Sequence, residues 1–211
     1  GFTEFIFLIG HLGDKISDYF GDGQKWGVSI TYYREERPMG TAGALAEIAD
    51  LLSDDFYVFY GDTVMDVDLK RMLDFHLQHH ADATLLVHPN DHPFDSDLVD
   101  INHNGSIKQF YPKPHADDFV CRNMVNAALF IFNKKVINSI SRGVKTHIEK
   151  DVLPACLQKG MRLFGYVSTE YVKDMGTPER YLQVCEDWRC GRVRTMNYEY
   201  PRRAVFLDRD G

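Results

Sequence analysis

The sequence lacks the features that mark several large classes of protein. It has no run of about 18 apolar residues, the length that a membrane-spanning helix needs. It also lacks an excess of basic residues, because its net charge is −7, and general nucleic-acid binding requires a basic face. No signal peptide, internal repeat or low-complexity tract is visible. We therefore expect a cytoplasmic globular protein without a membrane or nucleic-acid partner.

Cysteine is scarce, and its spacing is uninformative for metal binding. The four cysteines form no Cys-x-x-Cys pair: Cys121, Cys156, Cys185 and Cys190. This pattern favours reduced thiols over a disulfide or metal set. The 211 residues, 44% of them hydrophobic, are enough for one domain with a single core.

Apolar runs and amphipathic segments alternate along the first part of the chain. Short apolar or alternating runs predict strands over residues 3–10, 27–33, 55–62 and 82–89. Helical spacing predicts helices over residues 14–20, 41–52 and 68–80, with Thr41 and Asp68 as N-caps. This alternation predicts an α/β fold, a Rossmann-like, mostly parallel sheet with flanking helices. The carboxyl ends of the strands then share one edge, where ligands usually bind.

The rhythm changes in the second part of the chain. A small β-rich insertion is expected over residues 97–132, with a hairpin turn at Asn104-Gly105. Further predicted elements are helices over 133–141 and 147–159, a strand over 162–167 and a helix over 178–189. Residues 190–203 show no period, so a linker is favoured over a functional basic patch. Residues 204–208 then begin a new buried strand. The expected domains are therefore 1–189, a linker over 190–203, and a further strand over 204–211.

Asp62 is the first candidate for chemistry, because it ends a predicted strand. Mg²⁺ takes hard oxygen ligands, often one or two carboxylates together with substrate phosphates. Gly61 lets the backbone approach a ligand closely. The alternative is an ordinary turn aspartate that caps the next helix. Asp174 precedes a helix start in "DMGTPERY" and would complete a two-carboxylate site if it met Asp62; otherwise it only favours the helix dipole.

Two more stretches could bind a phosphorylated ligand. "PMGTAGALAE" (38–47) is a Gly-containing loop that opens a helix, so its amides could meet an anionic or polar group. The alternative is a loop that only packs closely. Lys113 stands between two prolines, which suits a fixed charge directed at a phosphate. The alternative is an exposed lysine of an edge strand.

Taken together and in order, these stretches resemble the sugar-phosphate nucleotidyltransferases. The matching segments are residues 19–45, 59–69, 107–114, 125–132, 148–157 and 174–181. The resemblance implies that NTP, with GTP favoured by "GTAG", and a sugar 1-phosphate give an NDP-sugar and pyrophosphate, with Mg²⁺ as cofactor. Such chemistry depends on positioning and electrostatics. A homo-oligomer is compatible with this resemblance.

The resemblance assigns roles to individual positions. Asp62 and Asp174 match the two metal-binding aspartates, and Lys113 matches the lysine that contacts the sugar phosphate. Gly61 and Asn126 match positions at the sugar. The loop that lines the base pocket is matched by Gly40, Thr41, Ala42 and Gly43.

Two departures from the family pattern affect the expected activity. Pro112 replaces the usual Glu before the lysine, which leans towards a heptose 1-phosphate rather than the glucose and mannose types. The family's opening strand and its Gly-rich loop, with an Arg and a following Lys for the triphosphate, are missing before Gly1. We therefore expect a chain truncated at its start and inactive by itself.

The end of the chain resembles a second family. "VFLDRDG" is similar to the first motif of haloacid dehalogenase-like phosphatases, in which Asp208 would be the nucleophile and Asp210 the general acid/base. The alternative is a strand that ends in a charged turn. A fusion of a phosphatase and a nucleotidyltransferase would serve nucleotide-activated heptose synthesis, as for lipopolysaccharide. Two other interpretations stay open: a regulatory module that binds a nucleotide sugar, and a phosphatase with an N-terminal scaffold.

Overall fold

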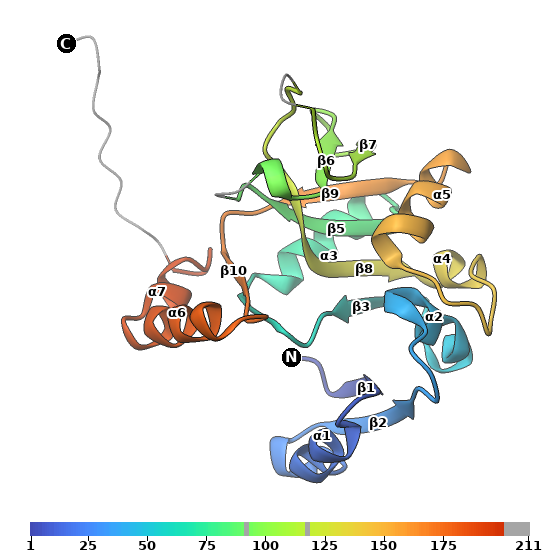
Figure 1. Ribbon diagram of the computed structural model, residues 1–211, viewed down its shortest axis with the longest axis vertical. Coiled ribbons are helices and arrows are strands. Elements are labelled where there is room, and N and C mark those ends of the chain that lie inside the picture. Colours follow the sequence, from blue (N-terminus) through green and yellow to red (C-terminus); the bar gives the residue numbers. More distant parts are fainter. Residues whose placement is uncertain (91–92, 117–118, 201–211) are drawn as a thin grey trace. The chain divides into compact units, whose positions relative to one another are not determined.

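The computed structural model describes residues 1–90, 93–116 and 119–200, whose helices and strands are labelled in Figure 1. The chain divides into two compact units. Unit 1 comprises Gly1–Phe56 and Asn133–Gly160, and unit 2 comprises Tyr57–Phe132 and Met161–Gly211. In the described part of the chain, no helix has the length and apolar character needed to cross a membrane.

The N-terminal part of unit 1 is a β-α-β element, as the sequence predicts. Strands β1 (Glu4–Ile9) and β2 (Ser29–Arg34) pair in parallel, and helix α1 (Gly13–Phe20) lies between them in the chain. A short 3₁₀ helix, η1 (Gln24–Trp26), precedes β2. Phe7 on β1 makes edge contacts with Phe20 and Tyr32, with ring centroids 5.4 and 5.8 Å apart. These aromatic contacts fix the helix against the strand pair.

Helices make up the rest of unit 1. They are α2 (Gly40–Glu47), η2 (Ala49–Leu51), α4 (Lys134–Asn138), η4 (Ile148–Val152) and α5 (Leu153–Gln158). The prediction of Thr41 as an N-cap is wrong, because α2 already begins at Gly40 and Met39 holds the cap position. The Thr41 hydroxyl instead accepts a hydrogen bond from the Ile148 amide at 2.8 Å. Tertiary contact with the 146–149 segment thus decides where α2 begins.

Unit 2 is built on the larger sheet, in the order β7-β6-β8-β5-β9. The strands are β5 (Ala83–His88), β6 (Leu98–Ile101), β7 (Ile107–Tyr111), β8 (Val125–Asn133) and β9 (Leu163–Val167), and β3 (Asp55–Phe59) also pairs with β8. A 3₁₀ helix, η3 (Pro93–Asp95), precedes β6. The hairpin turn is confirmed, since Gly105 has a φ of 84° between β6 and β7.

The α/β class is confirmed, but the larger sheet is mixed rather than mostly parallel. β5 and β9 are parallel, whereas β8 runs antiparallel to β5 and to β6. Parallel neighbours need a crossover, usually a helix, and α4 and α5 lie between β8 and β9 in the chain. The chain reaches β8 through the β6–β7 hairpin without such a helix, so β8 returns in the opposite direction.

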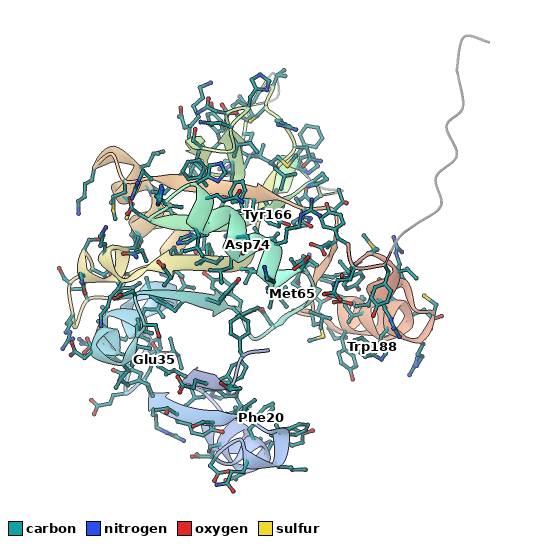
Figure 2. All side chains as sticks on the ribbon, turned by 180° about the vertical axis from the view of Figure 1, so that it is seen from behind. Phe20, Glu35, Met65, Asp74, Tyr166 and Trp188 are labelled. Carbon is teal, nitrogen blue, oxygen red and sulfur yellow. The ribbon has the colours of Figure 1, made fainter. Side chains whose placement is uncertain are left out.

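The core of unit 2 lies between the sheet and helix α3 (Leu69–Gln78). Asp68 caps α3 as predicted, since its side chain accepts from the Arg71 amide at 2.9 Å. The core cluster has seven buried members: Val67, Met72, Leu86, Ala127, Leu129, Ile131 and Tyr166. Met65, which is partly buried, packs against this cluster (Figure 2). Burial of such side chains contributes about 1.5–3 kcal/mol each, which anchors the neighbouring β4 strand.

A second, two-stranded sheet in unit 2 carries the C-terminal helices. β4 (Thr63–Asp66) pairs antiparallel with β10 (Tyr171–Asp174), and α6 (Pro178–Arg189) and α7 (Arg192–Thr195) follow. Within the expected linker over 190–203, the described residues up to 200 include helix α7 and contacts with the β4–β10 sheet. Val193 on α7 is buried, and the side-chain Nδ2 of Asn197 donates to Asp66 Oδ1 at 2.7 Å. Residues 201–211, with the expected strand over 204–208, lie outside the described part.

Candidate functional site

The β4–β10 ladder brings Asp62 and Asp174 to the same place in unit 2. Thr63, the residue after Asp62, is the register partner of Asp174. The carbonyl oxygen of Asp62 also accepts a hydrogen bond from the Met175 amide at 2.7 Å. The backbones of Asp62 and Asp174, far apart in the sequence, therefore meet at the end where β4 begins and β10 ends.

A segment of β8 contacts the chain just before Asp62. The Tyr60 amide, just before Gly61, donates to the carbonyl of Ala128 at 3.3 Å. The side chain of Asn126 accepts from the Ala128 amide at 3.3 Å. Asn126 thus shapes the backbone beside the Gly61-Asp62 turn. Ala128 has a φ of 56°, a left-handed conformation that costs a non-glycine residue about 1–2 kcal/mol. Backbone strain of this kind gathers at functional sites.

Asp174 is held by donors from the start of α6. Its Oδ1 accepts from Arg180 Nη1 at 2.6 Å and from the Gly176 amide at 3.2 Å. Partial burial works to raise the pKa of the Asp174 carboxyl, but these hydrogen bonds and the Arg180 charge outweigh it, so the pKa lies below its ordinary value. The group is therefore ionised at neutral pH and remains half accessible to a ligand.

The donor set of this site fits Mg²⁺ and disfavours softer metals. Asp62 is exposed, Asp174 is partly exposed, and both supply hard oxygen atoms. Across residues 1–90, 93–116 and 119–200, no three His, Cys, Asp or Glu side chains group closely enough to hold a metal among themselves. Mg²⁺ commonly binds one or two carboxylates and takes its other ligands from water and phosphate, so two aspartates suffice.

The Gly40–Gly43 loop is built in a different way, from backbone contacts inside unit 1. Gly40 has a φ of 75°, and a Cβ there would lie 2.4 Å from the carbonyl oxygen of Thr146. A Cβ on Gly43 would lie 2.8 Å from the Met39 side chain and from the Val144 carbonyl. The Ala42 amide donates to Thr146 O at 2.9 Å. Close packing therefore explains both glycines.

Lys113 follows β7 in the hairpin insertion of unit 2. Its backbone amide donates to Asp97 Oδ1 at 2.9 Å, and its side chain is exposed. The described contacts join Asp62, Asp174 and the Asn126–Ala128 segment, and none of these contacts includes Lys113. Asp208 and Asp210, the two residues assigned to phosphatase chemistry, lie outside the described residues.

Three features in and around this site are absent from the sequence predictions. Arg180 contacts Asp174, Ala128 follows Asn126 on β8, and the buried Glu170 lies at the opposite end of the β4–β10 ladder. Glu170 Oε1 accepts from the amides of Asp68 and Tyr198 at 2.9 and 3.0 Å, which fastens the C-terminal segment to the β4–α3 connection. The sequence places Arg180 in the first turn of a predicted helix, where a cation opposes the helix dipole, but only the structure identifies its carboxylate partner.

Comparison with known proteins identifies relatives of the whole region up to α6. A family model described as nucleotidyl transferase matches residues 1–189. Mannose-1-phosphate guanylyltransferase of Mycobacterium tuberculosis is 36% identical over 171 residues, which cover 80% of this chain and 46% of the relative. The catalytic subunit beta of this enzyme from Drosophila melanogaster is 34% identical over 165 residues, 76% of this chain and 43% of the relative. The chain thus spans about half the length of the curated relatives that it matches.

Solved structures have the same fold. HddC from Yersinia pseudotuberculosis has a TM-score of 0.75 at 24% identity, covering 89% of this chain and 80% of that chain. A structure of HddC complexed with GMP-PN has a TM-score of 0.71 at 24% identity, covering 87% of this chain and 77% of that chain. At this level of identity the likeness confirms the α/β fold.

Proposed function

The chain belongs to the nucleotidyl transferase family, and from this premise we propose that it serves nucleotidyl transfer from GTP to a sugar 1-phosphate. The products are a GDP-sugar and pyrophosphate. The observation that carries the proposal is the β4–β10 pairing, which supports a shared cation site at Asp62 and Asp174. Relatives named as mannose-1-phosphate guanylyltransferases support guanine as the base.

In this proposal, Asp62 and Asp174 hold Mg²⁺, which when bound neutralises charge on the phosphates. The two aspartates fix where the phosphates lie, because adjacent strands position them. Lys113 contributes a positive charge to the sugar phosphate from the hairpin insertion. Gly61 and Asn126 lie at the sugar, where Gly61 leaves room for close approach of the ligand. Positioning of this kind lowers the activation barrier, because the entropy cost of bringing two substrates together is met when they bind.

The base pocket is assigned to Gly40, Thr41, Ala42 and Gly43. These residues form the first turn of α2, where backbone amides other than that of Ala42 can donate to a polar edge of a ligand. The Thr41 hydroxyl accepts a hydrogen bond from the Ile148 amide at 2.8 Å and donates one to Glu149 Oε2 at 3.4 Å. These contacts order the loop before a base arrives, which supports selection by a few fixed hydrogen bonds.

The sugar is the part of the substrate that the family leaves open. Pro112 stands before Lys113, where the resemblance places a sugar-binding Glu. We therefore propose heptose 1-phosphate alongside mannose 1-phosphate as the substrates to compare. In this proposal, different contacts to the sugar select between these two substrates, and the cation site at Asp62 and Asp174 is the same for both.

Binding and turnover should be measured separately on the 211-residue chain. Isothermal titration with GDP-mannose, GDP-heptose, UDP-glucose and dTDP-glucose, each with Mg²⁺, tests the base and the sugar. We expect GDP-sugars to bind more tightly than the other two, and Mg²⁺ removal by EDTA to weaken binding. Equal binding of all four would contradict guanine selection, and binding of none would contradict the proposed function.

Turnover is followed as pyrophosphate release from GTP with each sugar 1-phosphate. The 211 residues contain no Gly-rich loop with an Arg and a following Lys for the triphosphate, so we expect binding without turnover. Release of pyrophosphate would confirm the transfer and show that this loop is not needed.

A further inference from the structure

Arg180 forms an ion pair with Asp174, one of the two carboxylates of the proposed cation site. Its Nη1 lies 2.6 Å from Asp174 Oδ1, and both side chains are 46% exposed. The same oxygen accepts from the Gly176 amide. Oδ1 of Asp174 therefore already has two donors before any cation arrives.

The position of Arg180 in α6 makes this pairing unusual. α6 runs from Pro178 to Arg189, and Thr177 caps it by accepting from the Arg180 amide at 3.3 Å. Arg180 thus sits in the first turn, where the helix dipole disfavours a cation. The charge on Asp174 offsets this cost, and the cap fixes the backbone from which the guanidinium reaches the carboxylate.

From this geometry, and resting on the proposed function, we propose that Arg180 is a built-in competitor of the divalent cation at Asp174. A cation that binds Asp174 must displace the guanidinium or bind beside its positive charge, and either event weakens binding of the free cation. A phosphate ligand offers Arg180 another anionic partner with matching geometry. The site therefore holds a free cation weakly and a cation that arrives with phosphate more tightly.

The test is a titration of the 211-residue chain with Mn²⁺ as the probe, followed by electron paramagnetic resonance without substrate. Arg180→Gln should bind Mn²⁺ about two- to fivefold more tightly than the wild type, the range expected of an exposed ion pair. Arg180→Lys keeps a positive charge and should fall between the two. Tighter binding is informative because a misfolded variant would lose affinity rather than gain it.

The matched control is Arg189→Gln, which removes an exposed arginine from the last turn of the same helix. It should leave the Mn²⁺ affinity as in the wild type. Equal tightening in both variants would overturn the proposal, because net charge alone would then explain the effect. Unchanged affinity in Arg180→Gln would overturn it as well.

A second control separates this proposal from the proposed function. If Asp62→Asn loses Mn²⁺ while Arg180→Gln matches the wild type, the cation site stands and only the competitor role fails. If neither the wild type nor any variant binds Mn²⁺, the cation site fails, and the role of Arg180 fails with it. A titration repeated with GDP-mannose should show a smaller gain for Arg180→Gln than the titration without it.

Discussion

The β4–β10 ladder and the Gly40–Gly43 loop both carry candidate site residues, but they hold them by opposite means. The ladder presents two carboxylates from strand ends, and a Cβ added at Gly61 would meet nothing within 4 Å. The loop is packed so tightly that a Cβ at Gly40 would lie 2.4 Å from a backbone oxygen. A substitution in the ladder therefore changes chemistry and spares the fold. In the loop, the same kind of change disturbs the fold before any ligand is involved.

The largest expected effect on stability is that of Gly40→Ala. The φ of 75° and the contact with Thr146 O together should cost about 2–4 kcal/mol in free energy of unfolding. Urea unfolding, followed by circular dichroism, measures this cost. A loss below about 0.5 kcal/mol would mean that the 146–149 segment moves aside easily, and the contrast between loop and ladder would then disappear.

Asp62→Asn should have the opposite profile. Since even groups behind a metal ligand change metal affinity by about 10–100-fold, losing one of two charged ligands should weaken Mn²⁺ binding at least about tenfold. Its free energy of unfolding should stay within about 0.5 kcal/mol of the wild type, because Asp62 is exposed. Calorimetric titration and urea unfolding of one preparation give both values. A large loss of stability with unchanged Mn²⁺ affinity would assign Asp62 to the turn alone.

Asp187 tests how the ladder is supported from α6. Asp187 is buried and accepts from Tyr171 on β10 at 2.9 Å and from Gln183 at 3.0 Å. Burial works to raise the pKa of its carboxyl, but these hydrogen bonds and the Arg192 charge lower the pKa below its ordinary value. The ionised group therefore stabilises the fold above the ordinary carboxyl pKa, and this stability is lost as the pH falls through the lowered value.

Asp187→Asn should cost about 1–2 kcal/mol at neutral pH. The difference from the wild type should begin to shrink below the ordinary carboxyl pKa of about 4, and should be lost as the pH falls through the lowered value of the folded protein. Urea unfolding of both proteins at a series of pH values measures this convergence. A difference that stays constant down to acid pH would show that shape, and not charge, makes Asp187 important.

The smallest expected change in stability is that of Gly61→Ala, the counterpart of Gly40→Ala. The φ of Gly61 is not positive, and a Cβ added there would meet no atom within 4 Å. The free energy of unfolding should therefore change by less than about 0.5 kcal/mol. If a ligand approaches the backbone there, binding of GDP-mannose with Mg²⁺ should still weaken. Unchanged binding would remove Gly61 from the sugar site, and a large loss of stability would contradict the open space.

Much of the local structure could be predicted from the sequence. The cap at Asp68, the turn at Gly105 and the start of α6 at Pro178 each depend on residues close together in the chain. Thr41 failed as a cap because its partner, the Ile148 amide, comes from a distant segment. The short helix α7 was missed because four residues show no period, and the burial of Val193 stabilises it.

The candidate site residues were named from the sequence, and their arrangement in space came only from the structure. The resemblance named Asp62 and Asp174, and the β4–β10 register brings their backbones close together. The roles of these residues, and those of Lys113 and Asn126, stay predictions. The left-handed Ala128 gave no signal, because alanine rarely adopts a positive φ and so does not mark such a position in a sequence. Arg180 became meaningful only when its carboxylate partner was known.

By itself, the sequence determined the α/β alternation, the helix and turn signals and the family, because these depend on residue types and spacings along the chain. Tertiary structure alone decided that the larger sheet is mixed, that residues 190–200 pack on the β4–β10 sheet, and that an arginine lies on Asp174. The physical reason is that strand direction, burial and ion pairing depend on which distant segments meet. Contacts between distant segments produce no periodic pattern in the sequence.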